Sequence, residues 1–185
     1  MKPARQIEPT EWMRAAPTRA VIDALSADGQ EIRFVGGCVR DTLLGHGHDG
    51  GGHSDIDIAT PDRPQQVIAL LDRAGIKNIP TGIEHGTVTA VAEGQHFEIT
   101  TLRVDVKTHG RHADVAFTDD WREDAARRDF TMNALSCTPD GQIHDPWDGI
   151  ADLEAGRVRF VGDAGRRIEE DHLRLLRFFR FHAWY

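Results

Sequence analysis

The sequence is poor in residues and segments that define several protein classes. Its only two cysteines, Cys38 and Cys137, are far apart and show no C-x-x-C spacing, which argues against a zinc site. No apolar run approaches the length of a membrane span, and the opening residues MKPARQIEPTEW lack the apolar core of a signal peptide. We therefore expect two core thiols, no membrane segment and a cytoplasmic location.

An excess of positive charge is also lacking. The 22 Lys and Arg residues face 30 Asp and Glu residues, a formal net charge of −8. This balance argues against a protein that binds nucleic acid with its whole surface, so any such contact must be local. With 39% hydrophobic and 28% charged residues, the 185-residue chain has the composition of one folded domain and the start of a second.

An acidic strand is the central motif that is present. In residues 54–59 (SDIDIA) the alternation places Asp55 and Asp57 on one face and Ile56 and Ile58 on the other. Two carboxylates about 6–7 Å apart repel each other and favour a divalent cation with oxygen ligands. The alternative is that both are solvated positions on an edge strand.

A glycine turn precedes this strand. Residues 31–35 are typical of a strand, and Gly36 and Gly37 lead into a helix that ends at Gly45. Free backbone N–H groups and a positive helix end suit a phosphate, to which Arg40 could add a charged fork. In the alternative, the turn is structural and Arg40 pairs with Asp41.

The connection over residues 46–53 (HGHDGGGH) is predicted to be a flexible loop without a preorganised metal site. Beyond it we expect a helix ending at Ala74, and then a hairpin around Glu93 and Gly94. This hairpin could bring Glu98 towards the aspartates as a third carboxylate; the alternative is an ordinary outward-facing residue. Residues 103–120 are expected to form a mobile loop, and residues 121–135 a helix leading into a strand.

Residues 168–184 show the spacing of one helix. At 100° per residue, Asp171, Arg174 and Arg177 share one broad face, whereas Arg180 lies about half a turn from Asp171 and is expected to be structural. A salt-bridged helix surface is the alternative.

Five ordered motifs together resemble the bacterial class II tRNA nucleotidyltransferase and poly(A) polymerase family, in the polymerase β-like nucleotidyltransferase superfamily. They are VGGCVRDTLLG, SDIDIAT, EDAARRDFTMNAL, DPWDGIADL and EDHLRLLRFFRF, and they cover roughly residues 30–184. The resemblance implies an α+β fold: a head with a small mixed β-sheet covered by helices, followed by the start of an all-α neck. We expect an N-terminal helical segment (1–28), the head (29–160) and the truncated neck (161–185).

The resemblance also implies roles for residues. Asp55 and Asp57 match the catalytic pair that binds Mg²⁺. Nucleotide-binding positions are matched by Gly37, Arg40, Arg128, Asp171, Arg174, Arg177 and Arg180. Asp171 and Arg174 would read the incoming base: Asp accepts from the exocyclic amino group of cytosine or adenine, and Arg donates to the adjacent ring nitrogen.

The implied activity is addition of CMP and AMP, from CTP and ATP, to the tRNA 3′ end without a nucleic-acid template, with release of pyrophosphate. The alternatives are a poly(A) polymerase of the same family, or a nucleotide-binding module without useful catalysis. Two departures from the family pattern are the lengthened 46–53 connection and the end of the chain at Tyr185, just past the arginine helix.

Overall fold

The computed structural model describes residues 2–28, 30–46, 56–109 and 112–185, with the side chains of residues 107–114 left out of the description. Asp55 and all of the 46–53 connection except its first residue, His46, therefore lie outside the described residues. Within these ranges an eight-stranded sheet has the order β1-β10-β9-β2-β3-β6-β5-β4. Its strands are β1 (Arg5–Gln6), β2 (Arg33–Val35), β3 (Ile56–Thr60), β4 (Lys77–Gly82), β5 (Thr87–Ala92), β6 (Gln95–Thr101), β9 (Ser136–Cys137) and β10 (Gln142–His144).

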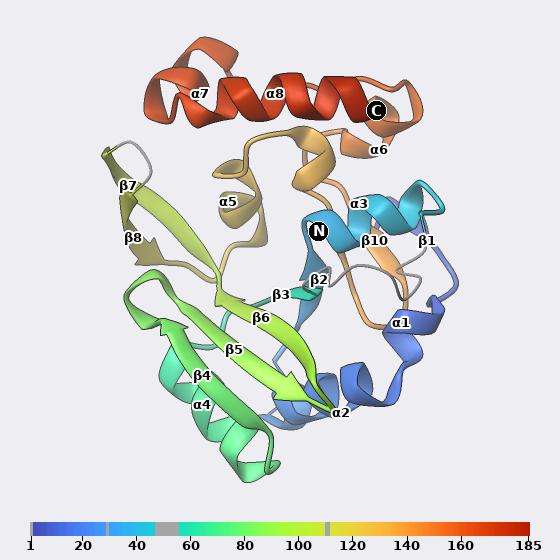
Figure 1. Cartoon of the computed structure of the whole chain (residues 1–185), viewed down its shortest axis with the longest axis vertical. Coiled ribbons are helices and arrows are strands. Elements are labelled where there is room, and N and C mark those ends of the chain that lie inside the picture. Colours follow the sequence, from blue (N-terminus) through green and yellow to red (C-terminus); the bar gives the residue numbers. More distant parts are fainter. Residues whose placement is uncertain (1, 29, 47–55, 110–111) are drawn as a thin grey trace.

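The helices surround this sheet (Figure 1). They are α1 (Glu11–Arg14), α2 (Ala16–Leu25), α3 (Gly37–Leu43), α4 (Pro64–Arg73), α5 (Trp121–Ala126), α6 (Gly149–Glu154), α7 (Ala164–Glu170) and α8 (Leu173–Trp184), with 3₁₀ turns η1 (Ser26–Asp28), η2 (Ile83–His85) and η3 (Thr131–Asn133). A new helix, α2, starts at Ala16 with Pro17 in its first turn, where proline is favoured. The predicted α+β class is confirmed, and the sheet is mixed because β3 and β6 pair in parallel.

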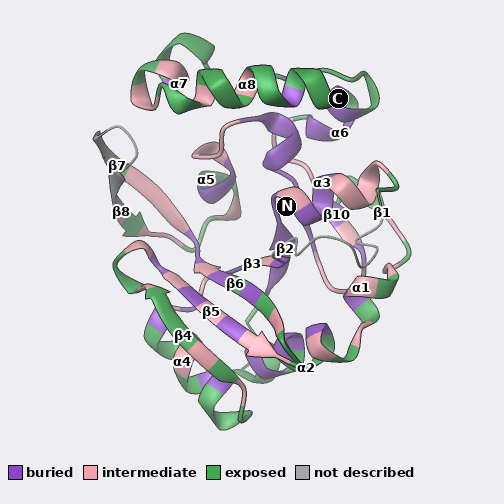
Figure 2. Cartoon of the chain, viewed as in Figure 1, coloured by how far each residue is buried: buried purple, intermediate pink, exposed green. Residues whose placement is uncertain are grey.

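Alternate side chains of β3 point to opposite faces of the sheet, one towards the core and one towards the candidate site. Ile56 and Ile58 are 1% and 0% exposed and belong to the main core cluster, to which α2 and α4 contribute Leu25 and Leu71. Figure 2 shows buried stretches on β5 and on the helices α2 and α4. Asp57 points to the other face of the sheet, as the alternation predicts.

The hairpin between β5 and β6 has the predicted turn, in which Glu93 and Gly94 both have positive φ. In contrast, the expectation of a loop over residues 103–120 is wrong. β7 (Arg103–His109) and β8 (His112–Phe117) form an antiparallel hairpin of their own. Val104 and Val106 alternate with charged residues in β7, and Ala113, Val115 and Phe117 stand at every second position in β8, so a strand period was present in the sequence and was overlooked.

The expected single helix over residues 168–184 is also wrong. α7 ends at Glu170, and Asp171 is extended at φ −153° and ψ 106° before α8 begins. Asp171 therefore shares no helical face with Arg174. Its Oδ1 instead accepts the Leu173 N–H at 3.0 Å, the capping contact for which short acidic side chains are favoured at helix starts.

The C-terminal helices lie across one end of the head (Figure 1). Phe178 and Phe181 of α8 pack with Phe130 and Phe160 in a second core cluster. At the N-terminus, β1 pairs with β10, so this segment joins the head sheet. The division into 1–28, 29–160 and 161–185 stays a prediction. No described helix has both the length and the apolar character needed to cross a membrane.

Candidate active site

The Gly36–Gly37 turn lies directly against the acidic strand. Gly36 has φ 73° and ψ −134°, a conformation that residues with side chains rarely adopt. A Cβ on Gly36 would lie 3.2 Å from Asp57 Oδ2 and 3.5 Å from Arg128 Nη1. The predicted phosphate turn, Asp57 and Arg128 therefore meet at one point of the structure.

Glu98 lies beside Asp57 on the open face of the sheet. The parallel register pairs Asp57 with Glu98, and paired residues of neighbouring strands point to the same face. Glu98 is exposed and Asp57 half-buried. Their oxygens are of the kind that Mg²⁺ prefers, so this pair fits that ion. Within the described residues no group of three or more possible metal ligands is found.

Asp124 fixes the arginines of the site. This carboxylate is 3% exposed and accepts from Arg127 Nε at 2.9 Å, from Arg128 Nη2 at 3.2 Å and from the Arg103 backbone N–H at 3.2 Å. Burial acts to raise the pKa of Asp124, but Arg128 and Arg127 outweigh it and hold the pKa below its ordinary value. Asp124 thus stays ionised and orients Arg128 beside Asp57.

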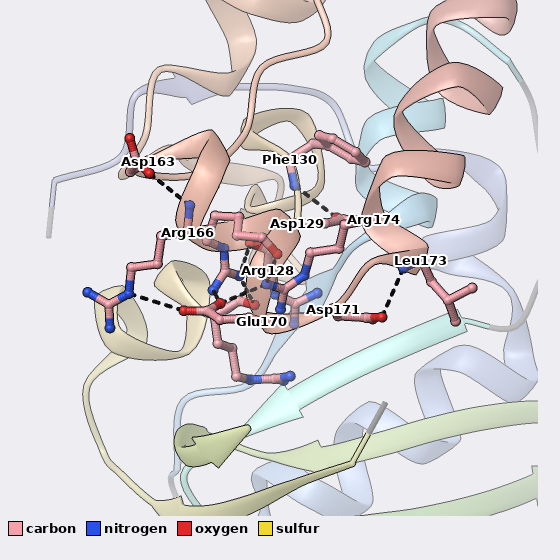
Figure 3. Close-up of polar contacts among 11 residues, drawn as sticks. Arg128, Asp129, Phe130, Asp163, Arg166, Glu170, Asp171, Leu173 and Arg174 are labelled. Carbon is pink, nitrogen blue, oxygen red and sulfur yellow. Dashed lines mark hydrogen bonds and ion pairs between the residues drawn. The ribbon is translucent and has the colours of Figure 1, made fainter. Parts of the chain in front are cut away.

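The end of α7 and the start of α8 lie against this arginine pair (Figure 3). Arg167 Nη2 donates to the Arg128 carbonyl at 2.7 Å, and Arg167 also pairs with Glu170. Arg174 Nη1 donates to Glu170 Oε2 at 2.8 Å, so Glu170 joins both arginines. This chain of contacts places Asp171 and Arg174 at the Arg128 end of the site.

Arg40 is buried and has direct partners. Its Nε and Nη2 donate to the two carboxylate oxygens of Asp41 at 2.8 and 3.0 Å, and its Nη1 donates to Asn133 Oδ1 at 2.7 Å. The Arg40 guanidinium also lies 5.1 Å from the ring centroids of Phe181 and Tyr185. Of the two alternatives for Arg40, the pairing with Asp41 is confirmed, and a contact with phosphate stays a prediction.

The remaining two arginines of α8 differ in their surroundings. Arg177 Nε donates to Asp129 Oδ2 at 2.6 Å, which ties α8 to the residue next to Arg128. Arg180 is exposed, and its guanidinium lies 4.9 Å from the Phe181 ring centroid. The structure therefore brings together Gly37, Asp57, Arg128, Arg174 and Arg177 through short contacts or chains of contacts, and leaves Arg180 at the margin.

Residues 32–159 match the family described as poly A polymerase head domain, over more than half of the chain. The chain belongs to this family. The mitochondrial CCA tRNA nucleotidyltransferase 1 of Mus musculus is 45% identical over 166 residues, which are 89% of this chain and 37% of that protein. The CCA-adding enzyme of Lactiplantibacillus plantarum is 43% identical over 175 residues, 94% of this chain and 40% of that protein.

The fold comparison agrees with the family. The crystal structure of the Bacillus stearothermophilus CCA-adding enzyme in complex with CTP superposes with a TM-score of 0.76 at 38% identity, over 90% of this chain and 39% of that one. A CCA-adding enzyme in an apo form, 24% identical with a TM-score of 0.79, shares the fold. The chain spans about two fifths of the length of these relatives.

Sequence reasoning missed three polar residues of this head domain that hold the site together: Asp124, Asp129 and Asn133. Asp124 lies three and four residues before Arg127 and Arg128, and Asp129 lies four residues before Asn133, whose Nδ2 donates to it at 3.0 Å. The spacing of Asp124 to Arg127 and Arg128 is the available signal, since side chains three and four residues apart are neighbours on a helical turn. Asp129 and Asn133 meet across the extended residue Phe130, for which no spacing rule gives a signal.

Proposed function

We propose that this head domain transfers CMP and AMP from CTP and ATP to the 3′ end of tRNA without a nucleic-acid template. The observation that carries the proposal is the meeting of the Gly36 turn, Asp57 and Arg128. A close-approach glycine, a carboxylate and a fixed guanidinium are the groups that a triphosphate and its metal ion need. The relatives named as CCA-adding enzymes support the choice of tRNA as acceptor.

The residues then have distinct roles. Asp55 and Asp57 would hold Mg²⁺, which when bound promotes attack by the RNA 3′-hydroxyl and neutralises the triphosphate. Backbone N–H groups at Gly37 would bind the phosphates, and Arg128, held by Asp124, would offset charge on them as pyrophosphate leaves. The resemblance also assigns Arg40 to the nucleotide.

Base selection would fall to the turn between α7 and α8. Asp171 accepts hydrogen bonds and Arg174 donates them, a pattern that suits cytosine and adenine and disfavours uracil and guanine. The contacts of Arg174 with Glu170, and of Arg167 with the Arg128 carbonyl, keep this turn against the phosphate end of the site. Arg177 would align the same helix through Asp129, and Arg180 would contact the nucleotide or RNA more peripherally.

The test is incorporation of labelled nucleotide into tRNA that lacks its 3′ CCA end, with Mg²⁺ and with CTP or ATP supplied separately and together. CCA addition predicts CMP incorporation from CTP alone and AMP incorporation that depends on prior CMP addition. Incorporation of ATP alone, in long tails, would instead identify a poly(A) polymerase. CTP and ATP binding with no incorporation would identify a nucleotide-binding module. A cytoplasmic location is part of the proposal and has only the sequence prediction behind it.

A further inference from the structure

A closed circuit of side-chain contacts connects the C-terminal end of α8, through residues of the head, to an earlier turn of the same helix. The Tyr185 hydroxyl donates to Asp41 Oδ1 at 3.0 Å, and Asp41 also holds Arg40. Arg40 in turn donates to Asn133 at 2.7 Å. Tyr185 directly follows α8, whereas Arg40 and Asp41 lie on α3, which begins at the Gly36–Gly37 turn.

The second half of the circuit closes on α8. Asn133 Nδ2 donates to Asp129 Oδ1 at 3.0 Å, and Asp129 Oδ2 accepts from Arg177 Nε at 2.6 Å. Asn133 must use its oxygen towards Arg40 and its nitrogen towards Asp129, because an arginine only donates and a carboxylate only accepts. Each donor in the circuit therefore meets an acceptor, with two cations and two carboxylates in balance.

The centre of the circuit is shielded from water, whereas the Asp41 and Arg177 side chains are 27% and 44% exposed. Arg40 is 9% and Asn133 7% exposed, and the Asp129 side chain is 10% exposed. Phe181 and Tyr185 cover the Arg40 guanidinium. In such surroundings charge-assisted hydrogen bonds are strong, and the loss of one partner leaves a costly unsatisfied group.

Two anchor points on one helix determine its direction. Arg177 and Tyr185 are eight residues apart, which is roughly 12 Å along a helix axis. Arg174 lies one turn from the Arg177 anchor. A helix anchored at both points, in addition to the packing of Phe178 and Phe181, holds Arg174 in one place relative to the head. Loss of one anchor leaves that end of the helix held by packing alone.

We infer that Arg40 acts on base selection as a positioning residue: with Asp41 and Asn133 it clamps α8 to the head and so places Arg174 for the incoming base. This inference rests on the proposed function for the meaning of Arg174. It differs from a phosphate contact for Arg40 in a measurable way. Phosphates are common to all four nucleoside triphosphates, so loss of a phosphate contact weakens all of them equally, whereas a displaced α8 weakens discrimination between bases.

The first test measures nucleotide affinities of the whole chain by calorimetry with CTP and UTP, for the wild type, Arg40→Lys, Asp41→Asn and Tyr185→Phe. The clamp predicts that each variant lowers the preference for CTP over UTP, by about threefold to tenfold for Asp41→Asn, as expected for the net contribution of one ordinary hydrogen bond. Arg73→Gln, which removes an exposed arginine of α4 that pairs with Asp28, is the matched control and should leave the preference unchanged. Equal weakening of CTP and UTP in Arg40→Lys, with Asp41→Asn at the wild-type preference, would overturn the inference.

The second test does not depend on nucleotide binding. Spin labels at Lys77→Cys on β4 and Leu176→Cys on α8, both exposed, report the distance between head and helix by pulsed electron paramagnetic resonance. Burial raises the pKa of Cys38 and of Cys137 to about 12, so neither native thiol should take a label in the folded protein. The clamp predicts one narrow distance distribution in the wild type and a broadened one in Asp41→Asn and Arg40→Lys.

The two tests separate the inference from the proposed function. A wild-type protein with no preference between CTP and UTP would contradict the proposed base selection, while the distance distributions would still test the clamp. Unchanged distributions in Asp41→Asn and Arg40→Lys would overturn the clamp whatever the nucleotide affinities show. Thermal unfolding of each variant establishes that it is folded at the temperature of the measurement.

Discussion

Asp57 and Arg128, 71 residues apart in the chain, both lie within 3.5 Å of the position that a Cβ on Gly36 would occupy. This relationship makes Gly36 a structural requirement of the site. A side chain there would need a backbone conformation suited to glycine and would crowd a carboxylate and a guanidinium at once.

We therefore expect Gly36→Ala to abolish turnover and to lower the free energy of unfolding by about 1–3 kcal/mol, the cost of a strained backbone conformation. Gly45→Ala is the matched control: its φ of 72° is also positive, but no atom of the described residues lies within 4 Å of the position of an added Cβ. It should lose about 1–2 kcal/mol and keep its turnover. Chemical denaturation and nucleotide incorporation check both variants; full activity in Gly36→Ala would show that the close approach is not needed.

Asp124→Asn should lower the free energy of unfolding by about 3–5 kcal/mol at neutral pH, because it leaves two arginines without their buried partner. The pKa of Asp124 is lowered in the folded protein, so its stabilisation is complete above the ordinary value of 3.8 and is lost as pH falls through the folded value. The stability difference between wild type and variant should therefore shrink in acid. Denaturation curves at several pH values would contradict this account if the difference stayed constant below pH 3.8.

We expect a second pH dependence of stability from His144, which is buried in its neutral form, whereas Asp124 is buried as a charge. It is 4% exposed, neither ring nitrogen has a hydrogen-bond partner among the described residues, and burial together with nearby Arg33 lowers its pKa. Below pH 6.5 the unfolded chain takes up a proton that the folded His144 resists. The free energy of unfolding should therefore decrease as the pH is lowered, by up to about 1.4 kcal/mol per pH unit. His144→Leu should flatten this slope, whereas His96→Gln, at an exposed strand position, should not. Equal slopes in wild type and His144→Leu would refute the assignment.

Glu98→Gln tests whether the residue paired with Asp57 is a metal ligand. If it is, the Mg²⁺ concentration for half-maximal turnover should rise by about tenfold or more, since one carboxylate of the set loses its charge. Glu84→Gln, which changes an exposed glutamate of η2, is the control. An unchanged Mg²⁺ requirement would leave Glu98 as an ordinary outward-facing strand residue.

Sequence reasoning located the elements that follow local rules. The alternation in β3, the glycine turn before α3 and the hairpin at Glu93 and Gly94 are set by residues that neighbour each other in the chain. The β7–β8 hairpin and the break at Asp171 were mispredicted. In the first, the polar character of the segment suggested a loop although Val104 and Val106 already show the strand period. In the second, a capping carboxylate interrupts a helical pattern that periodicity alone would continue.

The sequence indicated which residues form the candidate site, but not the contacts that position them. Motif order indicated Asp57, Arg128 and Arg174, but not that Asp124 and Glu170 hold the two arginines in place. The partners of Arg40 are Asp41 of α3 and Asn133 of η3, which lies 93 residues further along the chain. Such contacts depend on how distant segments pack, and no local spacing specifies them.

The central claim is that Asp57 belongs to a metal-dependent nucleotidyltransferase centre. The most direct measurement is the rate of pyrophosphate release by the wild type and by Asp57→Asn, with Mg²⁺, CTP and tRNA that lacks its CCA end. Circular dichroism and thermal unfolding establish that the variant keeps its fold. The account predicts a rate that requires Mg²⁺ and falls on the order of 10³-fold in Asp57→Asn. A folded Asp57→Asn protein that releases pyrophosphate at the wild-type rate would contradict it.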